Sequence, residues 1–394
     1  MMPTTTSQLA GLPPYIFVKM IGLRDSMAAK GNDVIDLGQG SPDLPTPGPV
    51  VEALCRSVRE DASTHRYPTT KGTAELRGAI AGWYKRRFDV TLDPETEVLP
   101  LVGSKEGLAH LCFAYLGKGD TALVPSPCYP VHYNAVILAG AKAALMPLKE
   151  ENGFLPDFKK IPAAAAAKAR MLILNYPNNP TGATVSGLKL FEDAVEFARK
   201  RRMLVVHDNA YSELCFDGYR APSFLQVPGA KAAGVEFHSL SKSFNMAGWR
   251  VGFAVGNAAA LAAVAKFKSF LDYGIPGFIQ SAAAAALNGP QDSIAPLCET
   301  YRRRRDLLVG ELARIGWTLP SPKATMYLWG RLPKKAAKLG SLRFAEDLVL
   351  KAGVVVAPGI GFGPHGEGYV RFALIDKEPR LKEAARRIGH YLHG

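Results

Sequence analysis

The sequence is poor in the features that mark disulfide-bonded and metal-binding proteins. It has five cysteines in 394 residues, an odd number, at wide spacings and without a CxxC pair. This pattern argues against a disulfide framework and a zinc site and is typical of a reducing compartment, so we expect a cytoplasmic protein. The eight histidines show no HExxH or similar spacing, so we expect no metal ion.

Long apolar runs are absent as well. No stretch of about eighteen apolar residues occurs, and the N-terminus lacks a charged segment followed by an apolar core. We therefore expect no membrane-spanning segment, no export signal and no membrane partner.

The net charge of +13 raises the question of a nucleic-acid or anionic membrane partner. The basic residues are scattered, however, and the one dense run (YRRRRD, residues 301–306) lies in an apolar pattern that predicts an amphipathic helix with a solvated basic face. We expect no nucleic-acid partner, because a basic surface that attracts small anionic metabolites explains the charge equally well.

From about residue 97 the sequence alternates short strand-like runs with helical segments. Seven runs fit strands: EVLPLV, TALVP, AALMPL, MLILN, MLVVHD, GVEFHS and VGFAVG. Such alternation predicts the α/β class, with a mostly parallel sheet covered by helices.

The length predicts two domains, because single hydrophobic cores stop growing near about 250–300 residues. We place a large domain at residues 46–285. The sequence then changes to long charged helices and three strand-like runs, TMYLWG, VVVAPG and YVRFAL, which predict a smaller domain at residues 286–394. Residues 1–45 are too few for a domain and fit an arm plus a first segment of the smaller domain.

Chemically capable residues follow the predicted strands at four places. Ligands of open α/β sheets bind beyond the carboxyl ends of the strands, so we expect these residues to converge. GSKEG (residues 103–107) fits an anion cradle of backbone N–H groups, although Ser104 fits a plain helix N-cap almost as well. Taken alone, Asp208 is an N-cap as readily as an active-site acid. The other three strand ends carry an amide, an acid, a phenol, a hydroxyl and an amine: Asn179, Asp208, Tyr211, Ser239 and Lys242.

Together these motifs resemble those of the class I/II aminotransferases, which are pyridoxal-phosphate enzymes of fold type I. The likeness covers nearly the whole chain, from DLGQGSPD (residues 36–43) to VRFA (residues 370–373), with NNPTG, DNAY and SLSKSFNMAGWRVG in the family's order. HRYPTTKG, GSKEG, FDGYRAPS, KATMYLW and PGIGFG are similar to the LL-diaminopimelate and alanine aminotransferase-like branches. The resemblance implies a large domain with a mostly parallel sheet sandwiched by helices, a smaller α+β domain, and a homodimer with shared active sites.

The resemblance assigns three residues to catalysis with pyridoxal 5'-phosphate. Lys242 would form a Schiff base with the cofactor aldehyde, since only a primary amine can do so, and would then carry the substrate Cα proton. Asp208 would keep the pyridine nitrogen protonated, and Tyr211 would hydrogen-bond the phenolic oxygen together with Asn179. Tyr129 would stack on the cofactor ring, with core packing as the alternative.

The remaining assignments concern the cofactor phosphate and the substrate. The resemblance implies these phosphate partners, the last from the neighbouring subunit: Ser104, Lys105, Ser239, Arg250 and Tyr67. Arg371 would grip the substrate carboxylate with a bidentate guanidinium, the alternative being an exposed charge on a strand. Gly40 would let that carboxylate approach the backbone, and Asn179 and Tyr15 would also contact the substrate.

The predicted activity is transfer of an amino group between an L-amino acid and a 2-oxo acid, with glutamate and 2-oxoglutarate as one pair. LL-diaminopimelate, alanine, aspartate and aromatic amino acids all remain possible donors. A carbon–sulfur β-lyase of the same fold is the alternative, because it would share Lys242 and Asp208. A non-catalytic regulator would need a DNA-binding extension, which residues 1–45 do not resemble.

Two short strings match motifs of other enzyme classes. Residues 239–242 fit the S-x-x-K motif of penicillin-binding enzymes, but no S-D-N or K-T-G accompanies it. Residues 361–366 fit G-x-G-x-x-G, but a strand-like run follows where a dinucleotide site requires a helix. We therefore interpret residues 361–366 as a loop that closes over the substrate.

Overall fold

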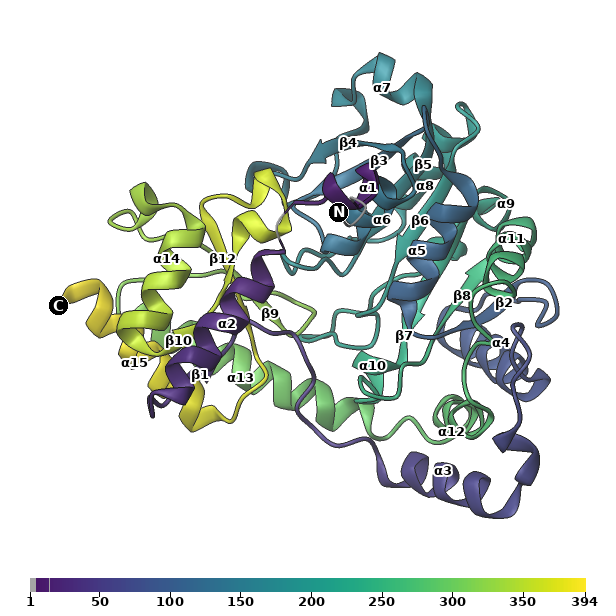
Figure 1. The fold of residues 1–394 in the computed structure, drawn as a ribbon, viewed down its shortest axis with the longest axis horizontal. Helices are drawn as coiled ribbons and strands as arrows, with labels where there is room; N and C mark the ends of the chain where they lie inside the picture. The colour runs from purple at the N-terminus through teal and green to yellow at the C-terminus, as the bar shows by residue number, and fades with distance from the viewer. Residues whose placement is uncertain (1–4, 14) are drawn as a thin grey trace, which may run out of the picture.

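The structure, a computed structural model, describes residues 5–13 and 15–394, so the first four residues of the expected arm and Pro14 lie outside the described residues. Its strands form sheets of two, three and seven strands. In Figure 1 the seven-stranded sheet and its helices lie on one side of the view, and the smaller sheets lie on the other side with α2 and the C-terminal helices.

The seven-stranded sheet has the order β2-β8-β7-β6-β5-β3-β4. Neighbours from β7 to β4 are parallel, whereas β8 is antiparallel to both β2 and β7. All seven predicted strands are present, and the mostly parallel α/β class is confirmed. Their bounds are β2 Val98–Leu101, β3 Thr121–Ser126, β4 Lys142–Pro147, β5 Ala169–Asn175, β6 Leu204–Asp208, β7 Gly234–Ser239 and β8 Gly252–Gly256.

Helices cover both faces of this sheet, which explains why most residues of its inner strands are buried. Successive side chains point to opposite faces, so Met171 and Ile173 pack on one side while Leu172 and Leu174 pack on the other. The first face is covered by α5 Ser104–Tyr115, α6 Pro130–Leu138 and α11 Ala258–Lys268. The second face is covered by α4 Ala74–Phe88, α8 Lys189–Arg199 and α12 Gly277–Asn288.

The two smaller sheets belong to a second hydrophobic core. In one, β1 pairs in parallel with β10, and in the other β12 lies between β11 and β9 in antiparallel order. The strands are β1 Ile35–Asp36, β9 Tyr327–Arg331, β10 Val354–Val355, β11 Ala357–Pro358 and β12 Tyr369–Ala373. The helices of this core are α2 Ile16–Ala29, α13 Ile294–Arg314, α14 Ser341–Asp347 and α15 Glu378–His393. The expected domain limits at residues 45 and 285 stay predictions.

The remaining helices are short or peripheral: α1 Ser7–Ala10, α3 Gly48–Glu60, α7 Ala163–Lys168, α9 Ala230–Ala233 and α10 Leu240–Ser243. Residues 359–366 form two single 3₁₀ turns that lead into β12, so no helix follows the glycine-rich string. Within the described residues, we find no helix that combines the length and the apolar character needed to cross a membrane.

The basic run on α13 differs from the expected solvated face. Arg304 and Arg305 are buried, because α13 packs against both the loop after β1 and the loop after β6. Arg304 forms a bidentate pair with Asp43, at 2.7 and 2.8 Å, and Arg305 pairs with Asp217 at 2.6 and 3.1 Å. Buried charges persist only when they are paired and hydrogen-bonded, so half of this run joins elements that are distant in sequence.

Candidate active site

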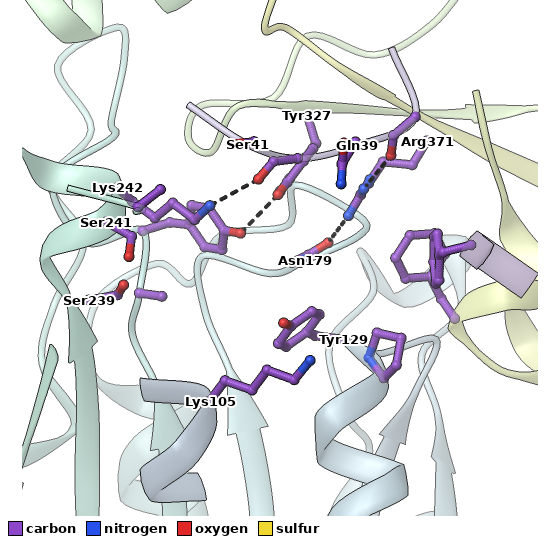
Figure 2. Close-up of a pocket in the computed structure, with 18 of the residues that line it drawn as sticks. Gln39, Ser41, Lys105, Tyr129, Asn179, Ser239, Ser241, Lys242, Tyr327 and Arg371 are labelled. Carbon is purple, nitrogen blue, oxygen red and sulfur yellow. Dashed lines mark hydrogen bonds between the residues drawn. The ribbon is translucent and has the colours of Figure 1, made fainter. Parts of the chain in front are cut away.

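A pocket of about 380 Å³ opens at the carboxyl ends of β5, β6 and β7, between the large sheet and the second core. Figure 2 shows Lys242, Tyr327 and Arg371 pointing into it from different elements. Of the site residues predicted from the sequence, the following line the pocket: Tyr15, Gly40, Ser104, Lys105, Tyr129, Asn179, Asp208, Tyr211, Ser239, Lys242, Arg250 and Arg371. Tyr67 does not line it.

Lys242 stands on α10, the single helical turn that follows β7. Its Nζ donates a hydrogen bond to the carbonyl oxygen of Gly40 at 3.0 Å. Burial lowers the pKa of this amine from 10.5, and the positive charges of Arg371 and Arg250 lower it further against the opposing influence of Tyr327. The neutral, nucleophilic form is therefore more accessible than in an ordinary lysine.

Asp208 ends β6 beside Asn175 of β5, whose Nδ2 donates to the Asp208 carbonyl oxygen at 2.8 Å. No α-helix starts after Asp208, so the N-cap alternative is wrong. His132 of α6 contacts Asp208 Oδ2 through Nε2 at 2.9 Å. The other oxygen, Oδ1, is buried and has no hydrogen-bond partner among the described residues. A buried acceptor of this kind is suited to a positively charged donor.

The start of α5 forms a cationic corner of the pocket. Gly103 occupies the N-cap position with φ of +78°, so the N-cap alternative for Ser104 is also wrong. The positive φ favours glycine there, and a Cβ at this position would also push the Arg250 guanidinium out of its place. Ser104, Ser239 and Arg250 line this corner, where the first backbone N–H groups of α5 have no partner within the helix. The corner is suited to an anion.

Arg371 lies in the middle of β12 and is only 5% exposed, so the alternative of an exposed strand charge is wrong. Its Nη1 donates to Asn179 Oδ1 at 2.8 Å and its Nη2 donates to the carbonyl oxygen of Gly38 at 2.9 Å. Figure 2 shows these two bonds at the wall of the pocket. Its Nε is buried and unpaired within the part of the chain that the structure describes. The guanidinium is thus held in place with donor capacity left for a carboxylate.

Two residues of the site were missed at the sequence level. His132 follows Tyr129 in SPCYPVH, but nothing in one chain pairs it with Asp208. Tyr327 lies in KATMYLW and brings its hydroxyl 3.0 Å from that of Tyr211. Both motifs are visible in the sequence, whereas the partners of the two residues lie 76 and 116 residues away along the chain, at the end of β6 and on the loop after it.

The aromatic residues differ in exposure. Tyr129 lies at the N-terminus of α6 and lines the pocket, and Lys105 extends toward the same side in Figure 2. Tyr15 precedes α2 and is 48% exposed at the pocket mouth. Tyr67 is 83% exposed and its ring centroid lies 4.7 Å from that of Tyr273.

A separate cluster of two acids and a histidine involves α5 and the segment after α11. Glu106, His110 and Asp272 present their ligand atoms within 4.8 Å of one another. The ammonium of Lys268, which is fully buried, binds Glu106 Oε1 at 2.8 Å and Asp272 Oδ1 at 2.9 Å. The lysine already supplies the positive charge that a metal ion would bring, and the group therefore gives no sign of a metal site.

The sheet topology, the lysine and acid at its carboxyl edge and the arginine that β12 places opposite them define a fold type I aminotransferase. A sequence model described as "Aminotransferase class I and II" matches residues 32–388, and the chain belongs to this family.

Three relatives give the closer context. LL-diaminopimelate aminotransferase of Dehalococcoides mccartyi is 50% identical over 98% of this chain and 98% of its own length. Glutamate-pyruvate aminotransferase AlaC of Escherichia coli is 46% identical over 96% of this chain and 91% of its own. The structure of substrate-bound BacF from Bacillus subtilis matches with a TM-score of 0.95 at 39% identity, over 99% of this chain and 98% of that one. Since both curated relatives are named as aminotransferases, the enzyme is a transaminase, and the carbon–sulfur lyase alternative is not favoured.

Proposed function

We propose that this enzyme uses pyridoxal 5'-phosphate to move an amino group from LL-diaminopimelate to 2-oxoglutarate, giving glutamate. The observation that carries the transamination is the convergence of Lys242, Asp208 and Arg371 on one pocket. The choice of donor rests on the relative at 50% identity.

The residues present fit this cofactor in charge and in shape. The unpaired Oδ1 of Asp208 matches a protonated pyridine nitrogen, and the cationic corner at Gly103 and Arg250 matches a phosphate. In this proposal the phosphate partners are Ser104, Lys105, Ser239 and Arg250, while Tyr129 contacts the ring. Tyr211 and Asn179 take the phenolic oxygen. When bound, the cofactor supplies an electron sink for the pair left at the substrate Cα.

Lys242 has two tasks in the proposed reaction. Its Nζ would hold the cofactor aldehyde covalently, and the lowered pKa favours the neutral amine that such a bond needs. Freed from that bond, the same Nζ would carry one proton between the substrate Cα and the aldehyde carbon of the cofactor, in opposite directions in the two half-reactions.

The substrate carboxylate is bound by Arg371, whose guanidinium is already oriented by Asn179 and Gly38. Pre-orientation lowers the entropy cost of binding and fixes the Cα beside Lys242. We expect Gly40 and Tyr15 to contact the same substrate. Gly40 also presents its carbonyl oxygen to Lys242 Nζ, which places the two groups on one side of the pocket.

We further propose that the enzyme acts in the cytoplasm as a homodimer in which Tyr67 reaches the phosphate site of the neighbouring subunit. Tyr67, Phe270, Leu271 and Tyr273 are large hydrophobic residues that are 60% to 83% exposed. Exposed apolar patches of this kind mark protein interaction sites. A monomeric variant should accordingly lose activity.

The decisive experiment follows the absorbance of the cofactor while the purified enzyme is mixed with one amino donor and no 2-oxo acid. LL-diaminopimelate should convert the cofactor to its aminated form with kcat/KM at least about tenfold above L-alanine, the margin that about 1.4 kcal/mol gives. Faster conversion by L-alanine would instead favour a glutamate–pyruvate activity like that named for the relative at 46% identity. Release of pyruvate and ammonia from cysteine-like substrates, without amination of the cofactor, would contradict transamination.

A further inference from the structure

Tyr327 is a fully buried tyrosine whose hydroxyl lies inside the pocket, yet none of the roles above uses it. It is the first residue of β9 and pairs with Ala373 of β12, so its backbone belongs to the second core. Its hydroxyl lies 3.0 Å from the hydroxyl of Tyr211, which stands on the loop after β6. This hydrogen bond therefore joins the two halves of the pocket, and Figure 2 shows Tyr327 directed toward the side where Lys242 lies.

Two features hold the Tyr327 ring in this position. The guanidinium carbon of Arg371 lies 4.1 Å from the ring centroid, a cation–π arrangement. A Cβ at position 40 would collide with the Tyr327 hydroxyl, so Gly40 is required to be glycine by this tyrosine. Gly40 in turn accepts the hydrogen bond of Lys242 Nζ. The face of the Tyr327 ring thus contacts Arg371, and its hydroxyl contacts Gly40, the residue that accepts the Lys242 hydrogen bond.

The backbone just before β9 carries strain. Thr325 has φ of +74°, which is unusual for a β-branched residue and costs about 1–3 kcal/mol. It is held there by a hydrogen bond from its own N–H to the Leu214 carbonyl oxygen at 2.9 Å, three residues beyond Tyr211. Strain of this kind persists only where the surrounding contacts enforce it. Here the enforcing contact is the hydrogen bond from Thr325 to Leu214, which joins the start of β9 to the loop that carries Tyr211.

We propose that Tyr327 is a positioning residue for transamination: its hydroxyl donates to the phenolic oxygen of Tyr211, so that the proton of Tyr211 is directed at the cofactor. This inference rests on the proposed function. Each phenol has one proton to donate, so a donor behind Tyr211 determines where the Tyr211 proton points. A donated hydrogen bond also strengthens the next one in the chain.

The test is a double-mutant cycle on the cofactor-loaded enzyme with Tyr327→Phe, Tyr211→Phe and both together. The first readout needs no substrate: it is the pH midpoint at which the absorbance of the bound cofactor changes. A hydrogen bond to an oxygen anion favours the deprotonated form, so loss of donors should raise this midpoint. Tyr327→Phe should raise it less than Tyr211→Phe, and the double variant should equal Tyr211→Phe alone, because Tyr327 acts through Tyr211.

The second readout separates turnover from binding. Tyr327→Phe keeps the ring beneath Arg371, so we expect kcat to fall about tenfold, the effect of one hydrogen bond, while KM changes little. Tyr301→Phe is the matched control. Tyr301 is a buried tyrosine on α13 whose hydroxyl makes no hydrogen bond to any described residue, and its loss should change neither the midpoint nor kcat.

Two results would overturn the proposal: an unchanged midpoint and kcat in Tyr327→Phe, or midpoint shifts that simply add in the double variant. If Tyr327→Phe does not fold, Gly40→Ala serves in its place, because the new Cβ displaces the hydroxyl and should raise the same midpoint. Failure of the proposed function is distinct, since the unmodified enzyme would then show no cofactor absorbance or no transamination.

Discussion

His207 and Asp208 are neighbours at the end of β6, yet they belong to two buried polar clusters of opposite character. Because successive strand residues face opposite sides, His207 points toward α8 while Asp208 meets His132 of α6. We call the first set the inner cluster: Tyr84, His207, Asn209, Glu236 and His238. The second set is the pocket cluster: Asp208, Tyr211, Lys242, Tyr327 and Arg371.

In the inner cluster the central carboxylate is fully used. Oε1 of Glu236 accepts from Asn209 Nδ2 at 3.1 Å and also contacts Tyr84 and His238, and Oε2 is bonded to His207 Nδ1 at 2.9 Å. Burial alone would raise the pKa of Glu236, but hydrogen bonds and charge from His207 and His238 hold it well below 4.5. A buried charge satisfied in this way contributes to the structure and offers nothing to a ligand.

The pocket cluster is equally buried, but here the charged groups themselves are incompletely paired, whereas the unpaired atom of the inner cluster is the neutral Oδ1 of Asn209. Oδ1 of Asp208 and Nε of Arg371 have no hydrogen-bond partner within the described residues, and Lys242 Nζ has a single backbone contact. The comparison teaches that burial and charge do not by themselves mark a functional site. The mark is polar capacity left open toward a cavity, because an unpaired buried group costs free energy that a ligand can recover.

Lys242→Ala should show the largest difference between the loss of turnover and the loss of stability. Turnover should fall by about 10⁴-fold or more, since in the proposed mechanism the same amine holds the cofactor and moves the proton. The free energy of unfolding of the cofactor-free protein should change by less than about 1 kcal/mol, because one hydrogen bond is lost. Steady-state kinetics and urea unfolding check both values, with exposed Lys189→Ala as the control. An active Lys242→Ala enzyme would contradict the mechanism.

Asp208→Asn replaces a carboxylate by an amide in the pocket cluster. We expect the cofactor to bind but kcat to drop by about 10³-fold, because the charge that would stabilise a protonated pyridine in the proposed mechanism is gone. The free energy of unfolding should change little, since the amide oxygen can still accept a hydrogen bond from His132. Normal turnover would remove the assigned role, and a large loss of stability would place Asp208 with the inner cluster.

Glu236→Gln makes the same substitution in the inner cluster and should have the opposite outcome. We expect a loss of about 3 kcal/mol in the free energy of unfolding, because the amide that replaces the buried carboxylate has only one acceptor oxygen for the donors around it. Turnover per folded molecule should change far less than in Asp208→Asn.

The pH dependence of unfolding sharpens this prediction. The folded pKa of Glu236 lies below its ordinary 4.5, so its contribution is present above that pH and disappears as the pH falls through the folded value. The difference in the free energy of unfolding between Glu236→Gln and the unmodified protein should therefore become smaller at acidic pH. A constant difference from neutral to acidic pH would contradict the charge assignment.

Much of the fold and of the site was predictable from local signals. The seven strands follow from β-rich runs at regular intervals, and the placement of polar residues at their ends follows from the topology of open α/β sheets. The positions of Lys242, Asp208 and Arg371 in one pocket were expected on these grounds and on the family's motifs. Only their roles stay predictions.

Other features could not be predicted, because they depend on partners from distant segments. Arg304 and Arg305 are part of a run of four arginines, and only contacts with Asp43 and Asp217 decide that these two are buried. Gly40 was assigned to the substrate carboxylate, whereas the structure adds a separate need for glycine, the Tyr327 hydroxyl.

The sequence by itself determined the class of fold, the family and the chemical groups of the site, because strand periodicity and contiguous motifs are local properties of the chain. Tertiary structure alone decided which of the buried polar groups are left without a hydrogen-bond partner. His207 and Asp208 are adjacent in sequence, and only the packing of α6, β7 and the second core satisfies the one and leaves an oxygen of the other free. The physical reason is that hydrogen-bond satisfaction is a property of the surroundings of a side chain and not of the side chain itself.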